Sequence, residues 1–158
     1  IEEPMDFGNK NYSSLADLQR LMISLLFPND AEAAPLGLSD AQREHLLAAL
    51  TGRLSPRKFA DDHKPMLPGV LEVREPDEIR YVSKSGRAYG FHLENAYIED
   101  VKSKRGYFVT ATIYANPNGT LNDDDYGYDD TTRPFLARLG KVLSEKLLGE
   151  RAAAAEPD

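Results

Sequence analysis

The spacing of the apolar residues changes twice along this chain, and this change limits the folds that the chain can adopt. Up to about residue 50, leucines recur every three or four positions, which is the period of an amphipathic helix. Between residues 79 and 115, apolar and polar residues alternate and β-branched and aromatic side chains are frequent, which is typical of strands. From about residue 131 the helical spacing returns. Because helices precede and follow the strands and do not alternate with them, the sequence predicts an α+β fold.

Three helices are predicted before the strands. Ser14 and Ser39 each stand three residues before an Asp or a Gln, which is the spacing of a capping box, and leucines at helical spacing follow both. Ser55 is followed by a proline, which is favoured at the first position of a helix. The predicted elements are a helix over 14–27, a helix from Ser39 that Gly52 ends, a short helix from Ser55-Pro56, and a connecting loop over 61–78.

Three strands and a last helix follow. The polar, glycine-ended segment 101–106 lies between two strand patterns, which predicts an antiparallel hairpin. Phe135, Leu139 and Leu143 give the last helix an apolar face. The predicted elements are a strand from Ile79 that ends at Ser85-Gly86, strands over 93–100 and 107–115, a loop over 116–130, a helix over 131–148, and a frayed tail over 151–158.

The composition narrows the functional classes. Hydrophobic residues make up 41% of the chain and charged residues 28%, which argues against a disordered, collagenous or coiled-coil chain. The net charge of −7 repels phosphate backbones and therefore argues against nucleic-acid binding. Because the 158 residues include no cysteine, they cannot form a disulfide framework, a cysteine nucleophile or a cysteine-based zinc site. No apolar run reaches the roughly 18 residues of a membrane helix, so we expect no membrane span.

The segment Lys84-Ser85-Gly86 carries the strongest functional signal. A lysine at a strand end places positive charge at the edge of a cleft, and a neighbouring hydroxyl can donate a hydrogen bond to a substrate carboxylate. A glycine lets the substrate approach the backbone, and the next N–H, that of Arg87, can point at a developing oxyanion. This triplet resembles the K-[ST]-G element of penicillin-recognising serine enzymes. The triplet by itself also fits a plain strand end with a solvated lysine and a turn.

The surroundings of this triplet resemble the class A β-lactamase family, and within it the related serine hydrolases whose strand end has the pattern K-x-G-x-A-Y-G-F, here Lys84 to Phe91. The stretch SSLADLQRLMISLL is similar to the helix after the family's omega loop, and LSDAQREHLLAAL to the next helix. The resemblance extends over residues 10–149. It implies that residues 1–150 form the C-terminal part of a β-lactamase/transpeptidase-like domain, with helices, a three-stranded antiparallel meander and a C-terminal helix packed on the sheet.

The resemblance also implies a reaction and the residues that take part in it. The family performs acyl transfer, in which a serine attacks an amide, ester or β-lactam carbonyl, without a metal or another cofactor. Lys84, Ser85, Gly86 and the backbone N–H of Arg87 would then be catalytic. Lys84, Ser85, Arg87 and Tyr89 would bind a small-molecule or peptide substrate, and the protein would be periplasmic or secreted.

The family's nucleophile motif and its S-D-N element are not found in this sequence. Ser55 to Lys58 matches the nucleophile motif S-x-x-K by its letters but comes after the helices that should follow a nucleophile, and Ser55 is better explained as a helix N-cap. Ser39-Asp40 is followed by Ala41, not by the Asn of the family's S-D-N element. We therefore expect a parent enzyme but an inactive 158-residue chain. A non-catalytic module that binds peptide or cell-wall fragments, or a structural accessory domain, remains the alternative.

The acidic loop over 122–130 is a candidate cation site. In an EF-hand alignment Tyr126 occupies a ligand position and Arg133 replaces the closing glutamate, so the sequence favours a solvated loop over a non-standard calcium site. Asp129 or Asp130 is then the expected N-cap of the last helix. The histidines lack ligand spacing, and we expect each to be structural or exposed: His45, His63 and His92.

The resemblance predicts a partner as well. In the family's sheet further strands lie beside the strand that corresponds to 107–115, and without them this strand is an open, apolar edge that tends to associate. We therefore expect the missing N-terminal half or a second copy of the chain to pair there. Ile1 begins the sequence without an initiator methionine, a basic segment or an apolar segment, so we expect a processed or truncated chain.

Overall fold

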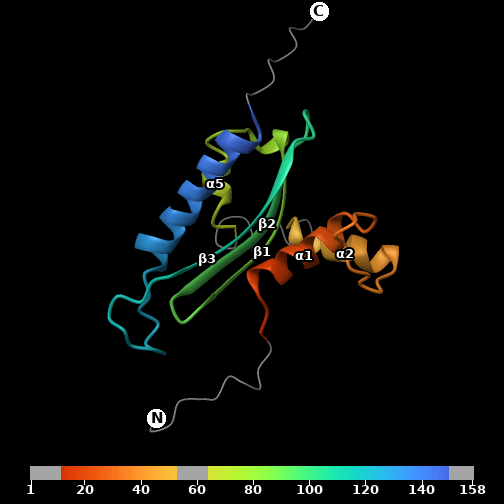
Figure 1. Ribbon diagram of the computed structural model, residues 1–158. Helices are drawn as coiled ribbons and strands as arrows, with labels where there is room; N and C mark the ends of the chain where they lie inside the picture. Colours follow the sequence, from red (N-terminus) through yellow and green to blue (C-terminus); the bar gives the residue numbers. More distant parts are fainter. Residues whose placement is uncertain (1–11, 53–63, 150–158) are drawn as a thin grey trace, which may run out of the picture.

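A three-stranded antiparallel sheet with helices on both of its faces forms the body of the protein (Figure 1). The structure is a computed structural model and describes residues 12–52 and 64–149. The predicted order of helices, an antiparallel meander and a final helix is confirmed. Helices α1 (Leu15–Leu26) and α2 (Asp40–Leu50) cover one face of the sheet, and helices α4 (Leu67–Val70) and α5 (Arg133–Leu147) cover the other.

The first two helices begin where their capping residues predict. The Ser14 hydroxyl accepts the backbone N–H of Asp17 at 3.1 Å, so α1 starts at the next residue after the cap. Ser39 and Gln42 form the predicted capping box at α2, because each side chain accepts the backbone N–H of the other residue. Gly52 follows the end of α2 with a φ of 81°, a left-handed conformation that glycine adopts without strain.

The strands pair in the order β1-β2-β3, and the predicted hairpin between the second and third strands is confirmed. The predicted end of the first strand at Ser85-Gly86 is wrong, because β1 continues past this glycine. Tyr89 and Gly90 then make the two-residue turn to β2, both with positive φ, as in the turns that suit the twist of a hairpin. The strands are β1 (Ile79–Ala88), β2 (Phe91–Asp100) and β3 (Gly106–Tyr114).

The predicted connecting loop over 61–78 contains two short helices in its described part, α4 and the 3₁₀ helix η1 (Pro76–Glu78). The sequence gives no helical signal for α4, because this short helix has proline and glycine in its middle, and both have low helix propensity. It forms because it packs against α5, and two glycines let the two helices approach closely. A Cβ atom on Gly69 would lie 1.7 Å from the Ala137 carbonyl oxygen, and one on Gly140 would lie 2.5 Å from the Met66 carbonyl oxygen.

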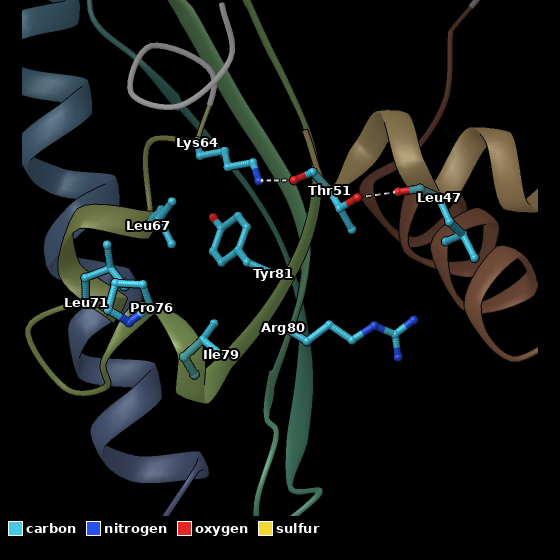
Figure 2. Close-up of a pocket in the computed structure, with 9 residues that line it drawn as sticks. All are labelled: Leu47, Thr51, Lys64, Leu67, Leu71, Pro76, Ile79, Arg80 and Tyr81. Atoms are coloured by element: carbon cyan, nitrogen blue, oxygen red, sulfur yellow. Dashed lines mark hydrogen bonds between the residues drawn. The ribbon is translucent and has the colours of Figure 1, made fainter. Parts of the chain in front are cut away.

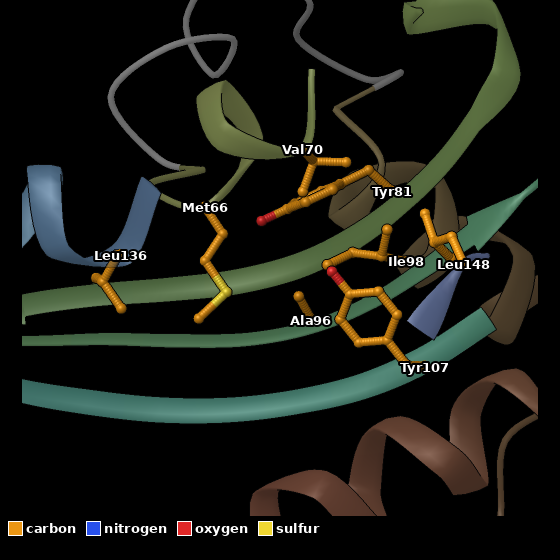
Figure 3. Packing of buried hydrophobic residues seen from close by; sticks show 8 residues of the cluster. All are labelled: Met66, Val70, Tyr81, Ala96, Ile98, Tyr107, Leu136 and Leu148. Carbon is orange, nitrogen blue, oxygen red and sulfur yellow. The ribbon is translucent and has the colours of Figure 1, made fainter. Parts of the chain in front are cut away.

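An apolar cluster on each face holds the helices to the sheet. On the α4 and α5 side, Met66, Ile98 and Leu136 are fully buried (Figure 3). On the α1 and α2 side, a smaller cluster forms around Met22 and Val82. Successive strand residues point to opposite faces, so the two sides of β1 and β2 belong to different clusters.

Several expectations concern segments outside the described residues: the short helix from Ser55-Pro56, the frayed tail over 151–158 and the segment that begins at Ile1. Within residues 12–52 and 64–149, no helix has the length and apolar character that a membrane crossing requires.

We expect Gly140→Ala to destabilise the protein, although alanine is favoured over glycine in helix interiors by about 1 kcal/mol. The added methyl group would overlap the backbone of Met66, so the free energy of unfolding should fall by about 1–3 kcal/mol in urea titrations followed by circular dichroism. Gly86→Ala is the control, because a Cβ atom there meets no atom within 4 Å. An unchanged or raised stability of Gly140→Ala would contradict the close crossing of α4 and α5.

Candidate functional site

The Lys84-Ser85-Gly86-Arg87 segment lies in the second half of β1, which is an edge strand. Within the described residues, β1 pairs only with β2. Because side chains alternate along a strand, Lys84 lies on the face that α1 and α2 cover, and Ser85 and Arg87 lie on the face that α4 and α5 cover. The space around Gly86 is open, which suits a ligand that approaches the backbone there.

The predicted substrate-binding side chains differ in exposure. Lys84 is exposed, and its Nζ donates a hydrogen bond to the carbonyl oxygen of Ser85. Ser85 is buried, with 9% of its surface exposed. The Arg87 guanidinium lies 5.4 Å from the ring centroid of Tyr128, and Tyr89 in the hairpin turn is exposed. The Lys84 amine and the Ser85 hydroxyl therefore leave the strand in opposite directions, so a ligand that contacts both has to lie along the open edge of β1.

The serines of this region are not placed as accessible nucleophiles. Ser83 and Ser85 both lie on the face of the sheet that α4 and α5 cover, and both are buried. Ser39 is the N-cap of α2, so its hydroxyl is engaged with the helix backbone. The S-x-x-K match that begins at Ser55 lies outside the described residues.

A buried carboxyl group, that of Glu94, lies on the same face as Ser83 and Ser85. Its Oε1 accepts the Tyr81 hydroxyl at 2.9 Å, and its Oε2 has no hydrogen-bond partner among the described residues. Burial raises the pKa of Glu94 to about 7, against smaller opposing effects of the Tyr81 and Ser83 hydroxyls and of the Lys64 charge. The pKa of Tyr81 is also raised well above its usual range. Burial is the largest cause, and the neighbouring Glu94 is the next.

Glu94 is not among the residues predicted from the sequence, although a signal is present there. The strand predicted over 93–100 includes Ala96 and Ile98, and a period of two places residue 94 on the same side as these core residues. A carboxyl group on the core face of a strand is a candidate for a shifted pKa.

His92 is fully buried and lies on β2 two residues closer to the hairpin turn than Glu94. Its Nδ1 lies 2.7 Å from the Thr132 hydroxyl, and its Nε2 has no partner within the described chain. Burial, with the nearby charges of Arg87 and Arg133, lowers the pKa of His92 to about 4, so the ring is neutral at pH 7. His92 is therefore structural, as predicted.

The acidic loop is held together by amide contacts. The Asn118 amide donates to Asp123 at 2.7 Å, and this hydrogen bond lowers the pKa of Asp123. Nowhere in residues 12–52 and 64–149 do three or more acidic or histidine side chains gather as they would around a metal ion.

The expected N-cap at Asp129 or Asp130 is wrong. A π-helical turn, η2 (Tyr128–Thr132), runs directly into α5, so both aspartates already lie inside a helical turn. Asp129 instead pairs with Arg133 at 3.0 Å.

Comparisons of the chain with protein-family models, with curated proteins and with solved structures gave no match.

We expect Glu94→Gln to remove a pH-dependent loss of stability. The unfolded chain releases this proton near the usual pKa of 4.5, whereas the folded chain keeps it until about pH 7. Between these values the folded state binds more protons, so wild-type stability falls as pH rises. The stability advantage of Glu94→Gln over wild type should therefore grow from pH 4.5 to pH 7 and level off at about 3 kcal/mol above it.

Urea titrations across this pH range measure the effect. Glu32→Gln, which removes an exposed carboxylate, is the control for the loss of a negative charge. A stability difference between Glu94→Gln and wild type that does not change with pH would show that Glu94 is already ionised in the folded protein at low pH.

Proposed function

We propose that this chain is the C-terminal part of a serine hydrolase of the β-lactamase and penicillin-binding type, and that the part with the nucleophile precedes it. The observation that carries the proposal is the position of Lys84-Ser85-Gly86 on the first strand of a three-stranded meander, along a free edge. Helices precede this meander and a long helix follows it, which is the order that the sequence resemblance implies.

The free edge of β3 and exposed apolar side chains on α5 support the proposal that another part of the protein packs against this chain. Within the described residues, β3 pairs only with β2, so its second edge lacks a neighbouring strand. On α5, Phe135 and Leu147 are 48% and 44% exposed although they are large and apolar. A further strand beside β3 and a helix against α5 would cover both.

In this proposal each residue of the segment has a role at the open edge of β1. Lys84 attracts a substrate carboxylate, and Ser85 donates a hydrogen bond to the substrate. Gly86 permits its approach, and the Arg87 N–H forms half of an oxyanion hole. Tyr89 lies beside this edge and contacts the substrate. The nucleophilic serine and the second oxyanion donor come from the other half, and the whole protein acts in the periplasm or outside the cell.

A non-catalytic module that binds peptide or cell-wall fragments is the second candidate. It is favoured by the burial of Ser83 and Ser85, which leaves the Lys84 edge able to bind an anionic peptide without a nucleophile of its own. The two candidates differ in whether a serine acylates.

We expect the 158-residue chain alone to form no stoichiometric adduct with a labelled penicillin or a fluorophosphonate, as measured by intact-mass spectrometry. In a longer gene product the adduct should form on a serine outside these residues. There, Lys84→Ala should slow acylation about a hundredfold, because it removes a charge that stabilises the transition state. Lys102→Ala should leave the rate unchanged, because Lys102 lies on the loop between β2 and β3, where it pairs with Glu78. An adduct on the chain itself, or wild-type acylation of Lys84→Ala, would contradict the proposal.

We also expect the isolated chain to self-associate through β3. Thr112→Lys places a charge on an exposed position of this open strand and should weaken association about tenfold in multi-angle light scattering, because like charges then meet across the paired edges. Ser103→Lys, on the exposed loop between β2 and β3, makes the same charge change away from the edge. A wild-type monomer whose 107–115 amides are fully protected from hydrogen exchange would argue against an open edge.

A further inference from the structure

A cavity of about 500 Å³ lies beside β1, between α2 and α4 (Figure 2). Its volume and its mainly apolar lining are those of small-molecule sites in proteins. The cavity is near the start of β1, whereas the Lys84 segment lies in the second half of this strand. Its apolar lining consists of Leu47, Leu67, Leu71, Pro76, Ile79 and the ring of Tyr81.

The side-chain amine of Lys64 lies among the apolar side chains that line the cavity. Its Nζ donates to the Thr51 carbonyl oxygen at 3.1 Å and lies 5.4 Å from the ring centroid of Tyr81 (Figure 2). An ammonium group has three donors, and within the described chain the Thr51 carbonyl is its hydrogen-bond partner. Partial burial lowers the pKa of Lys64, which means that the charged amine lacks part of its hydration. A negatively charged ligand group would restore this lost stabilisation.

Among the described lining residues, the charged side chains are those of Lys64 and Arg80, and no aspartate or glutamate is included, although the chain carries a net charge of −7. Arg80 pairs with Glu99 at 3.4 Å, so Lys64 is the cation that a ligand in the cavity would meet. The charge of Glu94 acts on Lys64, and the Glu94 carboxyl group accepts a hydrogen bond from the Tyr81 hydroxyl. The lining therefore favours an anion, and its leucines favour an apolar body over an inorganic ion.

We propose that this cavity binds an apolar carboxylate, such as a medium-chain fatty acid. The hydrocarbon chain packs against the leucines from α2 and α4, and the carboxylate accepts a charge-assisted hydrogen bond from Lys64 Nζ. The inference does not depend on the proposed acyl-transfer function, because it uses none of the residues of the Lys84 segment.

Sodium decanoate and the neutral alcohol decanol, both below their aggregation limits, test the proposal by isothermal titration calorimetry on the 158-residue chain. We expect decanoate to bind at least about tenfold more tightly than decanol, and backbone amide NMR shifts to cluster around Thr51, Lys64 and Tyr81. Lys64→Met keeps the apolar stem but removes the charge, so it should reduce the affinity for decanoate about tenfold and leave that for decanol unchanged. Lys64→Arg should retain binding.

Lys146→Met is the matched control, since it removes the charge of an exposed lysine in the last turn of α5, outside the cavity. It should bind decanoate like the wild type. Absence of decanoate binding, equal affinity of Lys64→Met and wild type, or NMR shifts that cluster away from these residues would each overturn the proposal. Circular dichroism of each variant establishes that the comparison is made between folded proteins.

Discussion

The structure depends on the burial of the central strand, β2, on both of its faces. Nearly all of its residues are buried, with Ala96 and Ile98 in the cluster under α5 and Tyr97 in the cluster under α1. A three-stranded sheet has only one interior strand, so the helices of both layers are positioned by the side chains of this strand. β1 and β3 each retain an edge without a described neighbour, and the two surfaces that suggest partners or ligands therefore lie beside β1 and β3.

The burial of β2 also explains why the pKa values of two of its carboxyl groups, those of Asp100 and Glu94, are shifted in opposite directions. At the end of the strand, Asp100 accepts the backbone N–H of Ser103 and pairs with Arg74 at 2.8 Å, and these contacts lower its pKa to about 2. Arg74 also donates to the carbonyl of Gly149, so this satisfied pair ties β2 to the end of α5. Glu94 has no cation within hydrogen-bond distance among the described residues, and burial raises its pKa instead. The first carboxylate stabilises the fold at neutral pH, and the second weakens it.

Local signals predicted much of the fold, and contacts between distant residues account for most of what they missed. The capping residues Ser14 and Ser39 define the starts of α1 and α2 from their own neighbours, so the sequence locates both. The helix α4 depends on the fit of Gly69 against α5, which no local pattern contains. The sequence predicts a strand end at Gly86, but a glycine in an exposed edge strand can continue the strand, and β1 does so. The sequence locates the candidate site as the segment from Lys84 to Arg87. It does not predict that the Lys84 and Ser85 side chains point in opposite directions, because this requires the strand to continue through the segment.

We propose that these residues complete a serine hydrolase whose nucleophile lies elsewhere in the same polypeptide. The intact mass of the protein purified from its natural source tests this proposal. We expect a mass well above the 17.6 kDa of this chain, with the additional residues N-terminal to it and including an S-x-x-K motif. A natural mass of 17.6 kDa would contradict it and would leave the Lys84 edge as a binding surface without catalysis.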